Sequence, residues 1–118
     1  MPIKNVLASV AVRDLESSIQ WYEKFFGKPP DSTLMSEVAE WKSPGGGWLQ
    51  VYLVPERAGS TSCTIAISNL DEEGRRLEKL GIDVGQRTSS RQVKTIMIKD
   101  PDGNSIALAE AFDPSIAA

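Results

Sequence analysis

An internal repeat is the feature of this sequence that most constrains its fold. Val10–Glu16 (VAVRDLE) resembles Ile65–Asp71 (IAISNLD), and the two segments begin 55 residues apart. The same spacing aligns Tyr22–Phe25 with Leu77–Leu80. Because a repeated sequence pattern is typical of a repeated structural unit, we expect the chain to consist of two similar halves.

The first half begins with a predicted strand that is followed by a helix. Apolar and small residues alternate over 6–12, which is typical of a strand with one buried side. Asp14 is a favourable N-cap, and apolar residues then recur at helical spacing as far as Phe26. Gly27 favours a left-handed C-cap, so the predicted helix ends there.

The second half carries the same signals in the same order. Ser62–Ile67 predicts a strand, and Asn69, with a glutamate three residues later, resembles a capping box. Gly81 is typical of the end of the helix that follows. Further along, Pro44–Trp48 aligns with Pro101–Ser105 at a spacing of 57 residues, and both segments are rich in turn-forming residues.

Three further strands are expected after each helix. They are predicted over 33–38, 40–43 and 48–54 in the first half, and over 83–86, 92–99 and 105–111 in the second. We therefore predict an α+β fold of two βαβββ modules that form a curved mixed sheet around a cleft, with the helices on the outer face. Module one covers about 3–55, the linker 56–60 and module two about 61–111, within a single domain of residues 1–118.

Composition excludes several kinds of partner. The net charge is −3, and the basic residues are scattered or alternate with glutamates, so we expect no nucleic-acid binding. No apolar stretch approaches the ~20 residues that span a bilayer, and no signal peptide is evident. We therefore expect a cytoplasmic protein without membrane contact. Sheet edges left unpaired by modules of this size favour a homodimer.

The repeat, the strand-Asp-Leu-helix start and the closing Asp-Pro-Asp-Gly-Asn-x-Ile turn resemble the vicinal-oxygen-chelate superfamily. This group contains glyoxalases, extradiol dioxygenases, fosfomycin-modifying enzymes and bleomycin-resistance proteins. The resemblance implies the two-module fold but not one activity, because the fold hosts several chemistries and also binding proteins. It extends over Ile3–Ala111 and rests on Val10–Leu15, Trp21, Tyr22, Ile65–Leu70, Leu80, Gly81 and Asp100–Leu108.

Metal-dependent members of this superfamily resemble one another at four ligand positions, two in each module. Carried onto this sequence through the motifs and the repeat, these positions are Leu7, Gln50, Ser62 and Ala107. Divalent metal sites of this kind need imidazole, thiolate or carboxylate ligands, and the chain has no histidine. The resemblance therefore implies no metal and no cofactor, and we expect metal-dependent glyoxalase or dioxygenase activity to be absent.

Strand alternation extends these positions to a set of cleft-facing side chains. The opposite parity is uniformly aliphatic and is expected to pack against the helices. The small, hydroxyl-bearing and aromatic character of the cleft set favours a flat or partly apolar ligand, although burial or a dimer interface would suit the same residues. The predicted ligand-binding residues are Leu7, Ser9, Trp48, Gln50, Tyr52, Ser62, Thr64, Met97 and Ala107.

Other reactive or aromatic residues have simpler interpretations. Trp21 and Tyr22 are expected in the core, whereas the parity of Trp41 leaves either face open. Cys63 is the only cysteine and has no histidine to activate it, so we expect a buried apolar residue. The catalytic residues are unknown, and the candidates are Glu40, Glu37 and Tyr52.

Three functions follow from this interpretation. The first is metal-independent binding of a small organic molecule, in the manner of bleomycin-resistance proteins, which would sequester an antibiotic or other aromatic metabolite. The second is a metal-free lyase or isomerase, in which one of those glutamates or Tyr52 transfers a proton. The third is a regulatory or interaction module without a small ligand.

Overall fold

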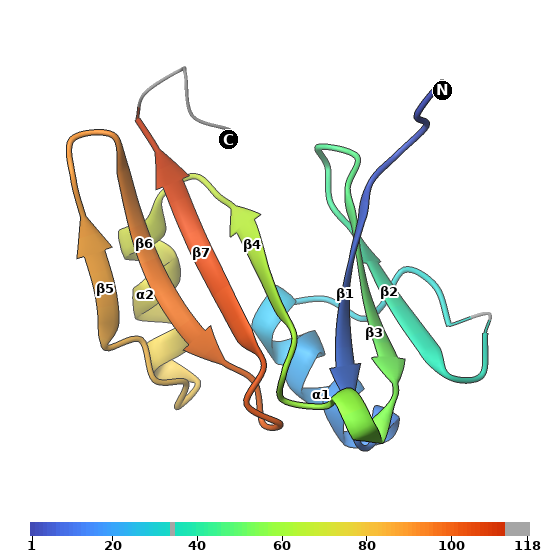
Figure 1. Cartoon of the computed structure of the whole chain (residues 1–118). Coiled ribbons are helices and arrows are strands. Elements are labelled where there is room, and N and C mark those ends of the chain that lie inside the picture. The colour runs from blue at the N-terminus through green and yellow to red at the C-terminus, as the bar shows by residue number, and fades with distance from the viewer. Residues whose placement is uncertain (34, 113–118) are drawn as a thin grey trace. The chain divides into compact units, whose positions relative to one another are not determined.

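The computed structural model describes residues 1–33 and 35–112 (Figure 1). Contacts group the chain into two units. Unit 1 is Met1–Thr61 together with Pro101–Asn104, and unit 2 is Ser62–Asp100 together with the described residues that follow Asn104. Within the described residues, no helix is long and apolar enough to cross a membrane.

Unit 1 is a three-stranded sheet with one helix. Its elements are β1 (Leu7–Val12), α1 (Leu15–Phe26), β2 (Val38–Lys42), β3 (Trp48–Leu53) and the short 3-10 helix η1 (Pro55–Arg57). The strand order is β1-β3-β2, with β3 parallel to β1 and antiparallel to β2.

The ends of α1 follow the sequence signals. The Asp14 side chain accepts a hydrogen bond from the Ser17 backbone N–H at 3.2 Å, which satisfies one of the unpaired donors of the first turn. Gly27 has φ 77°, and its N–H donates to the carbonyl of Glu23 at 2.8 Å. A residue with a Cβ would be strained in that conformation, so glycine ends the helix there.

The core of unit 1 lies between α1 and the sheet. Tyr22 is fully buried, and its ring centroid lies 6.0 Å from that of Trp41. Phe26 stacks on Trp41 at 5.5 Å, and the Trp41 indole N–H donates to the Lys28 carbonyl at 3.0 Å. Trp41 therefore faces the helix, as Tyr22 was predicted to do. Strand residues on the same side include Val10, Val12, Ala39, Leu49 and Val51.

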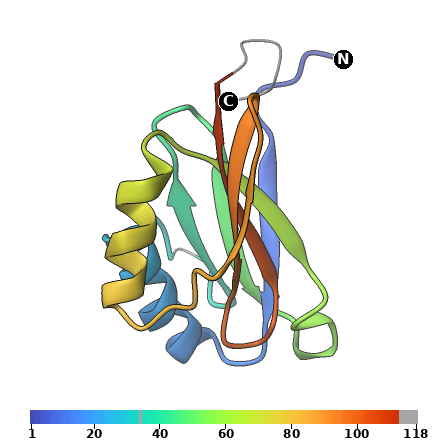
Figure 2. The same cartoon turned by 90° about the vertical axis from the view of Figure 1, so that its left-hand side faces the viewer.

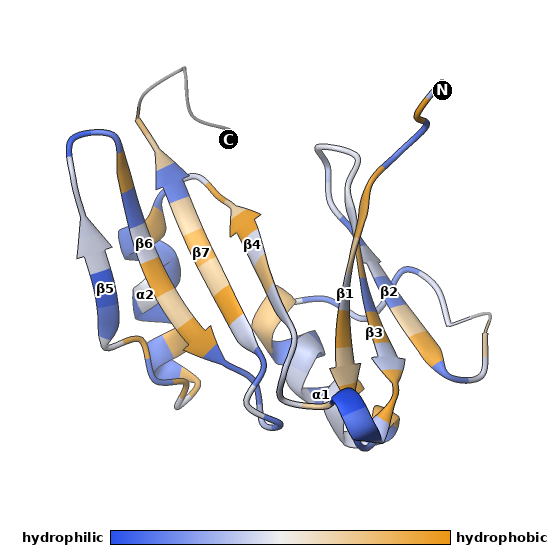
Figure 3. Ribbon diagram, in the orientation of Figure 1, coloured by the Kyte–Doolittle hydropathy of each residue, from blue (hydrophilic) through white to orange (hydrophobic). Residues whose placement is uncertain are grey.

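Unit 2 is a four-stranded sheet with one helix. Its elements are β4 (Ser62–Ala66), α2 (Leu70–Lys79), β5 (Gln86–Ser89), β6 (Val93–Lys99) and β7 (Ser105–Ala111). The order is β4-β7-β6-β5, with β4 parallel to β7 and the other pairs antiparallel. Figure 2 shows α2 on one side of this sheet, and Figure 3 shows apolar bands on β6 and β7 beside a hydrophilic β5.

The start of α2 differs in one bond from a standard capping box. The Asn69 side chain accepts from the Glu72 backbone N–H at 3.4 Å, as the sequence predicted. The reciprocal acceptor is not Glu72 but Glu110 on β7, whose two carboxylate oxygens accept from the backbone N–H groups of Asn69 and Leu70, each at 3.0 Å. A carboxylate from a neighbouring strand thus completes the helix N-terminus.

The strand registers reproduce the repeat. Leu7 lies opposite Trp48 in the β1–β3 pair, and Ser62 lies opposite Ser105 in the β4–β7 pair. These two pairs are related by the same spacings of 55 and 57 residues that relate the sequence segments. The α+β fold of two similar modules is therefore confirmed.

Two predicted strands differ from the structure. Thr33–Val38 is not a strand in the described residues: residues 31 and 32 pair with Glu40 and a turn follows at 36–37, so only the bridge between Ser32 and Glu40 remains. Leu34 lies outside the described residues. The strand predicted over 83–86 runs instead over Gln86–Ser89, because the Asp83 side chain accepts from the Gly85 N–H and turns the chain there. Part of the predicted linker forms η1.

Candidate functional site

The sheet of unit 1 has one face turned away from α1, and most predicted ligand-binding residues of the first half lie on it. On β3, the side chains of Trp48, Gln50 and Tyr52 alternate onto this face, while Leu49 and Val51 are buried beneath α1. We call it the open face of unit 1. By register it consists of three rows, Leu7–Trp48–Lys42, Ser9–Gln50–Glu40 and Ala11–Tyr52–Val38.

The middle row is joined by side-chain hydrogen bonds. The Ser9 hydroxyl donates to Gln50 Oε1 at 3.1 Å, and Gln50 Nε2 donates to Glu40 Oε2 at 2.9 Å. This orientation of the Gln50 amide satisfies both neighbours, since a carboxylate accepts but does not donate. Gln50 and Glu40 are half-buried. The row therefore presents a carboxylate whose position is fixed from two strands away.

The row beside it combines a cation with an aromatic ring. Lys42 Nζ lies 5.8 Å from the centroid of the half-buried Trp48 ring, within the range of a cation–π interaction. Leu7, on the other side of Trp48, is 46% exposed. On the third row, Tyr52 is flanked by Ala11 and Val38. The two aromatic side chains of β3 are thus separated by the hydrogen-bonded Gln50.

Two candidates lie elsewhere. Trp41, whose parity the sequence left open, is 2% exposed against α1 and is not part of the open face. Glu37 is exposed in the turn before β2, where its carbonyl accepts from the Leu53 N–H. Of the two glutamates, only Glu40 lies on the open face.

The sheet of unit 2 has an equivalent face, which carries the other predicted residues. Ser62 and Thr64 are exposed on β4, and Met97 on β6 is 37% exposed. Lys99, which sequence reasoning missed, donates from Nζ to the Ser105 hydroxyl at 2.7 Å. The rows of this face are Ser62–Ser105–Lys99, Thr64–Ala107–Met97–Gln86 and Ala66–Ala109–Thr95–Thr88.

Cys63 lies opposite Ile106, on the side of the β4–β7 pair that carries the buried aliphatic residues. Burial raises the pKa of the Cys63 thiol, and the negative charge of Asp100 raises it further. Both effects keep the group protonated at neutral pH and therefore weakly nucleophilic.

The donor set at the four family ligand positions does not fit a divalent metal. Leu7 and Ala107 have no donor atom in their side chains, and Ser62 offers only a hydroxyl. Both polar atoms of the Gln50 amide are already hydrogen-bonded, to Ser9 and Glu40. Among residues 1–33 and 35–112, no group of three or more His, Cys, Asp or Glu is placed to hold a metal.

Asn104 holds the end of β1 in place and was interpreted from sequence only as part of a turn. The residue is fully buried in unit 1, and its Nδ2 donates to the Ala11 carbonyl at 2.7 Å. Its Oδ1 accepts from the backbone N–H groups of Gly59 and Thr61, at 2.9 and 3.1 Å, and from the Thr61 hydroxyl at 2.6 Å. One side chain thus fixes the β1 terminus and the segment after η1.

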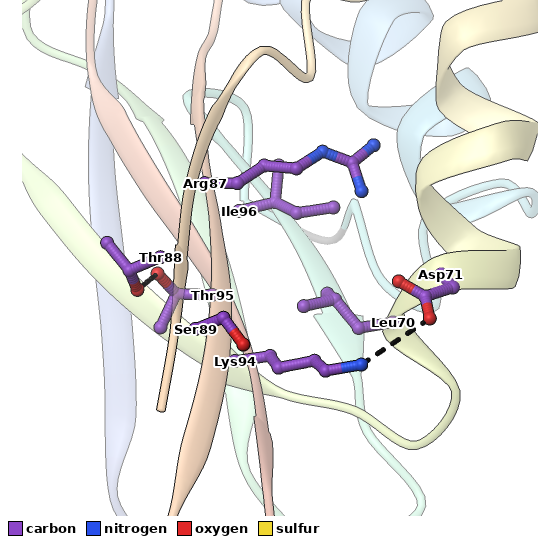
Figure 4. A pocket seen from close by; sticks show the side chains of 8 residues that line it. All are labelled: Leu70, Asp71, Arg87, Thr88, Ser89, Lys94, Thr95 and Ile96. Carbon is purple, nitrogen blue, oxygen red and sulfur yellow. Dashed lines mark hydrogen bonds and ion pairs between the residues drawn. The ribbon is translucent and has the colours of Figure 1, made fainter. Parts of the chain in front are cut away.

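A surface pocket of about 280 Å³ lies in a different place, between α2 and the β5–β6 pair of unit 2 (Figure 4). None of the predicted site residues lines it. Its walls are formed by Leu70, Asp71, Arg87, Thr88, Ser89, Lys94, Thr95 and Ile96.

The family of this chain is shown by a family model for the Glyoxalase/Bleomycin resistance protein/Dioxygenase superfamily, which matches residues 5–108. A search of curated proteins found no match. Among solved structures, a glyoxalase/bleomycin resistance protein from Catenulispora acidiphila is 28% identical, with a TM-score of 0.82 over 91% of this chain and 97% of that one.

Two more distant structures show the same fold. A bleomycin resistance determinant encoded on the transposon Tn5 is 18% identical, with a TM-score of 0.72 over 94% of this chain and 100% of that one. A lactoylglutathione lyase from Agrobacterium tumefaciens is 19% identical, with a TM-score of 0.75 over 92% of this chain and 95% of that one.

Proposed function

We propose that this chain, which belongs to the Glyoxalase/Bleomycin resistance protein/Dioxygenase superfamily, binds a small organic molecule without a metal ion. The observation that carries the proposal is the open face of unit 1. There, an aromatic ring lies one row from a glutamate that Gln50 holds in place.

The aromatic part of this face suits a planar ligand. The Trp48 ring is half-buried, so one part of it packs within the sheet while another part stays accessible. A flat ring that stacked there would remove apolar surface from water on both partners. The neighbouring Lys42 and Glu40 would meet polar groups at the ligand's edge, which supports binding of an aromatic metabolite or antibiotic.

The residues at the family's ligand positions support a metal-independent mode. Lactoylglutathione lyase and a bleomycin resistance determinant both share the fold, at 19% and 18% identity, so the fold alone does not choose between catalysis and binding. The side chains of Leu7 and Ala107 cannot coordinate a cation, which favours the binding function.

A second candidate is a metal-free lyase or isomerase, and the position of Glu40 favours it. Its carboxylate is half-buried on the open face and is held by the Gln50 amide, so it lies within reach of a molecule stacked on Trp48. A positioned carboxylate is a common general base. Catalysis would appear as turnover that Glu40→Gln abolishes while ligand affinity is kept.

We further propose a cytoplasmic homodimer that binds neither nucleic acid nor membranes. The first strand supports self-association, because β1 lies at the edge of its own sheet and the preceding Val6 is 73% exposed. The alternative of an interaction module without a ligand predicts no saturable small-molecule binding.

A screen of small aromatic compounds by two-dimensional amide NMR on chelator-treated protein tests the proposed function. We expect saturable shifts on β1, β2 and β3. Trp48→Ala should weaken binding of a compound found in this way by about 1–3 kcal/mol, whereas Trp48→Phe should retain much of the affinity. Equal affinity of wild type and Trp48→Ala would show that Trp48 is structural.

A further inference from the structure

The pocket between α2 and the β5–β6 pair is independent of the open faces. Arg87 lies opposite Ile96, and Ser89 lies opposite Lys94, so these four side chains share the face of the sheet that α2 covers. Figure 4 shows Arg87 and Lys94 on opposite sides of Ile96 and Leu70. The two cations therefore border a small apolar floor.

The Arg87 side chain is held in place by the backbone and by a glycine. Its Nε donates to the Val84 carbonyl at 2.9 Å. Gly74, in the middle of α2, faces the guanidinium: a Cβ at this position would lie 3.0 Å from Arg87 Nη2 and 3.1 Å from Ile96 Cδ1. Glycine is unfavourable inside a helix, so close approach of Arg87 gives it a structural reason.

The charge of Arg87 is not neutralised by a neighbour. Within residues 1–33 and 35–112, Arg87 forms no ion pair. Lys94, in contrast, pairs with Asp71 at 3.6 Å and lies 5.7 Å from the Phe112 ring centroid. Arg87 is thus the stronger anchor for an anion, because binding there need not displace a carboxylate.

The floor of the pocket adds an apolar contribution. Leu70 is 2% exposed and Ile96 is fully buried, so a ligand that covered them would meet apolar atoms beneath two polar walls. The volume of about 280 Å³ is at the lower end of the ~300–1,000 Å³ that is typical of small-molecule sites. The occupant must be correspondingly small.

We propose that this pocket binds a small organic carboxylate with an apolar or aromatic body. The guanidinium of Arg87 pairs with the carboxylate, and the body covers Leu70 and Ile96. The Ser89 hydroxyl and Lys94 border the opposite wall. This site is separate from the one proposed on unit 1, so either can fail without the other.

Titration of the full chain with benzoate, followed by two-dimensional amide NMR, tests the proposal. We expect saturable shifts at residues 70–71, 87–89 and 94–96, with millimolar affinity, and none with benzamide, which has the same shape without the charge. Arg87→Gln should weaken benzoate binding about tenfold or more. Arg91→Gln, in the exposed β5–β6 turn, should leave it unchanged.

A second variant tests the role of Gly74. Gly74→Ala places a methyl group against the guanidinium, and we expect it to weaken benzoate binding while the NMR spectrum stays that of a folded protein. The proposal would be overturned by equal affinity of wild type and Arg87→Gln, by equal binding of benzamide, by shifts confined to other residues, or by the absence of saturable shifts.

Discussion

Replacement of Asn104 by alanine should destabilise unit 1 more than any exposed asparagine does. The variant removes the acceptor of two backbone N–H groups, Gly59 and Thr61, and the donor to the Ala11 carbonyl. Each buried polar group left without a partner costs about 1–3 kcal/mol. Because such losses are not additive and water can enter in part, we expect a total of about 3–5 kcal/mol.

This loss is large beside the ~5–15 kcal/mol that stabilises a typical domain. It should lower the Tm by roughly 10–20 °C and should be measurable as a shift of the urea midpoint. Asn5→Ala is the matched control, because Asn5 is exposed and also makes two hydrogen bonds, to Gly46 and Val6. It should cost less than about 1 kcal/mol.

Asn104→Asp separates the two functions of the side chain. Aspartate keeps an acceptor for the Gly59 and Thr61 N–H groups but replaces the donor to the Ala11 carbonyl with an oxygen that repels it. We expect a loss of stability comparable with that of Asn104→Ala. Equal stability of Asn104→Ala and Asn5→Ala would refute the argument that this residue fixes the β1 terminus.

Two further predictions concern unit 2. Glu110→Ala should cost about 1–2 kcal/mol in urea unfolding, because the Asn69 and Leu70 N–H groups lose their acceptor, whereas the exposed Glu78→Ala should cost little; equal costs would contradict this role. Folded protein should react more slowly with iodoacetamide at Cys63 than unfolded protein does at mildly alkaline pH, because burial raises the pKa of the folded thiol. The unfolded thiol ionises first, so this group's contribution to stability is complete below the ordinary thiol pKa and is lost as the pH rises; equal alkylation rates would contradict it.

The sequence predicted those parts of the fold that depend on local patterns. Asp14 and Gly27 fixed the limits of α1, and the repeat spacing predicted the registers of the β1–β3 and β4–β7 pairs. The strand over 33–38 failed because its hydrogen-bonding partner, Glu40, pairs with residues 31 and 32. Nothing local reports which of two neighbouring segments forms a bridge.

Long-range side-chain partners were the main omission in the candidate site. Alternation placed Gln50 and Trp48 on one face, but the bond from Gln50 to Glu40 depends on a register that only the folded sheet defines. The asparagine of the closing turn gave no signal for its bonds to distant backbone groups. One signal was available for the pocket, because a glycine at position 74, within a predicted helix, is unfavourable unless something packs against it.

The most direct test of metal-independent binding is thermal unfolding of chelator-treated protein with added zinc, nickel, manganese or iron. A metal that binds the folded state at a hundred times its Kd would stabilise the protein by about 2.7 kcal/mol and raise the Tm by several degrees. Because Leu7, Gln50, Ser62 and Ala107 do not supply a ligand set, we predict no rise with any of the four ions. A saturable rise that Gln50→Ala removes would contradict the account.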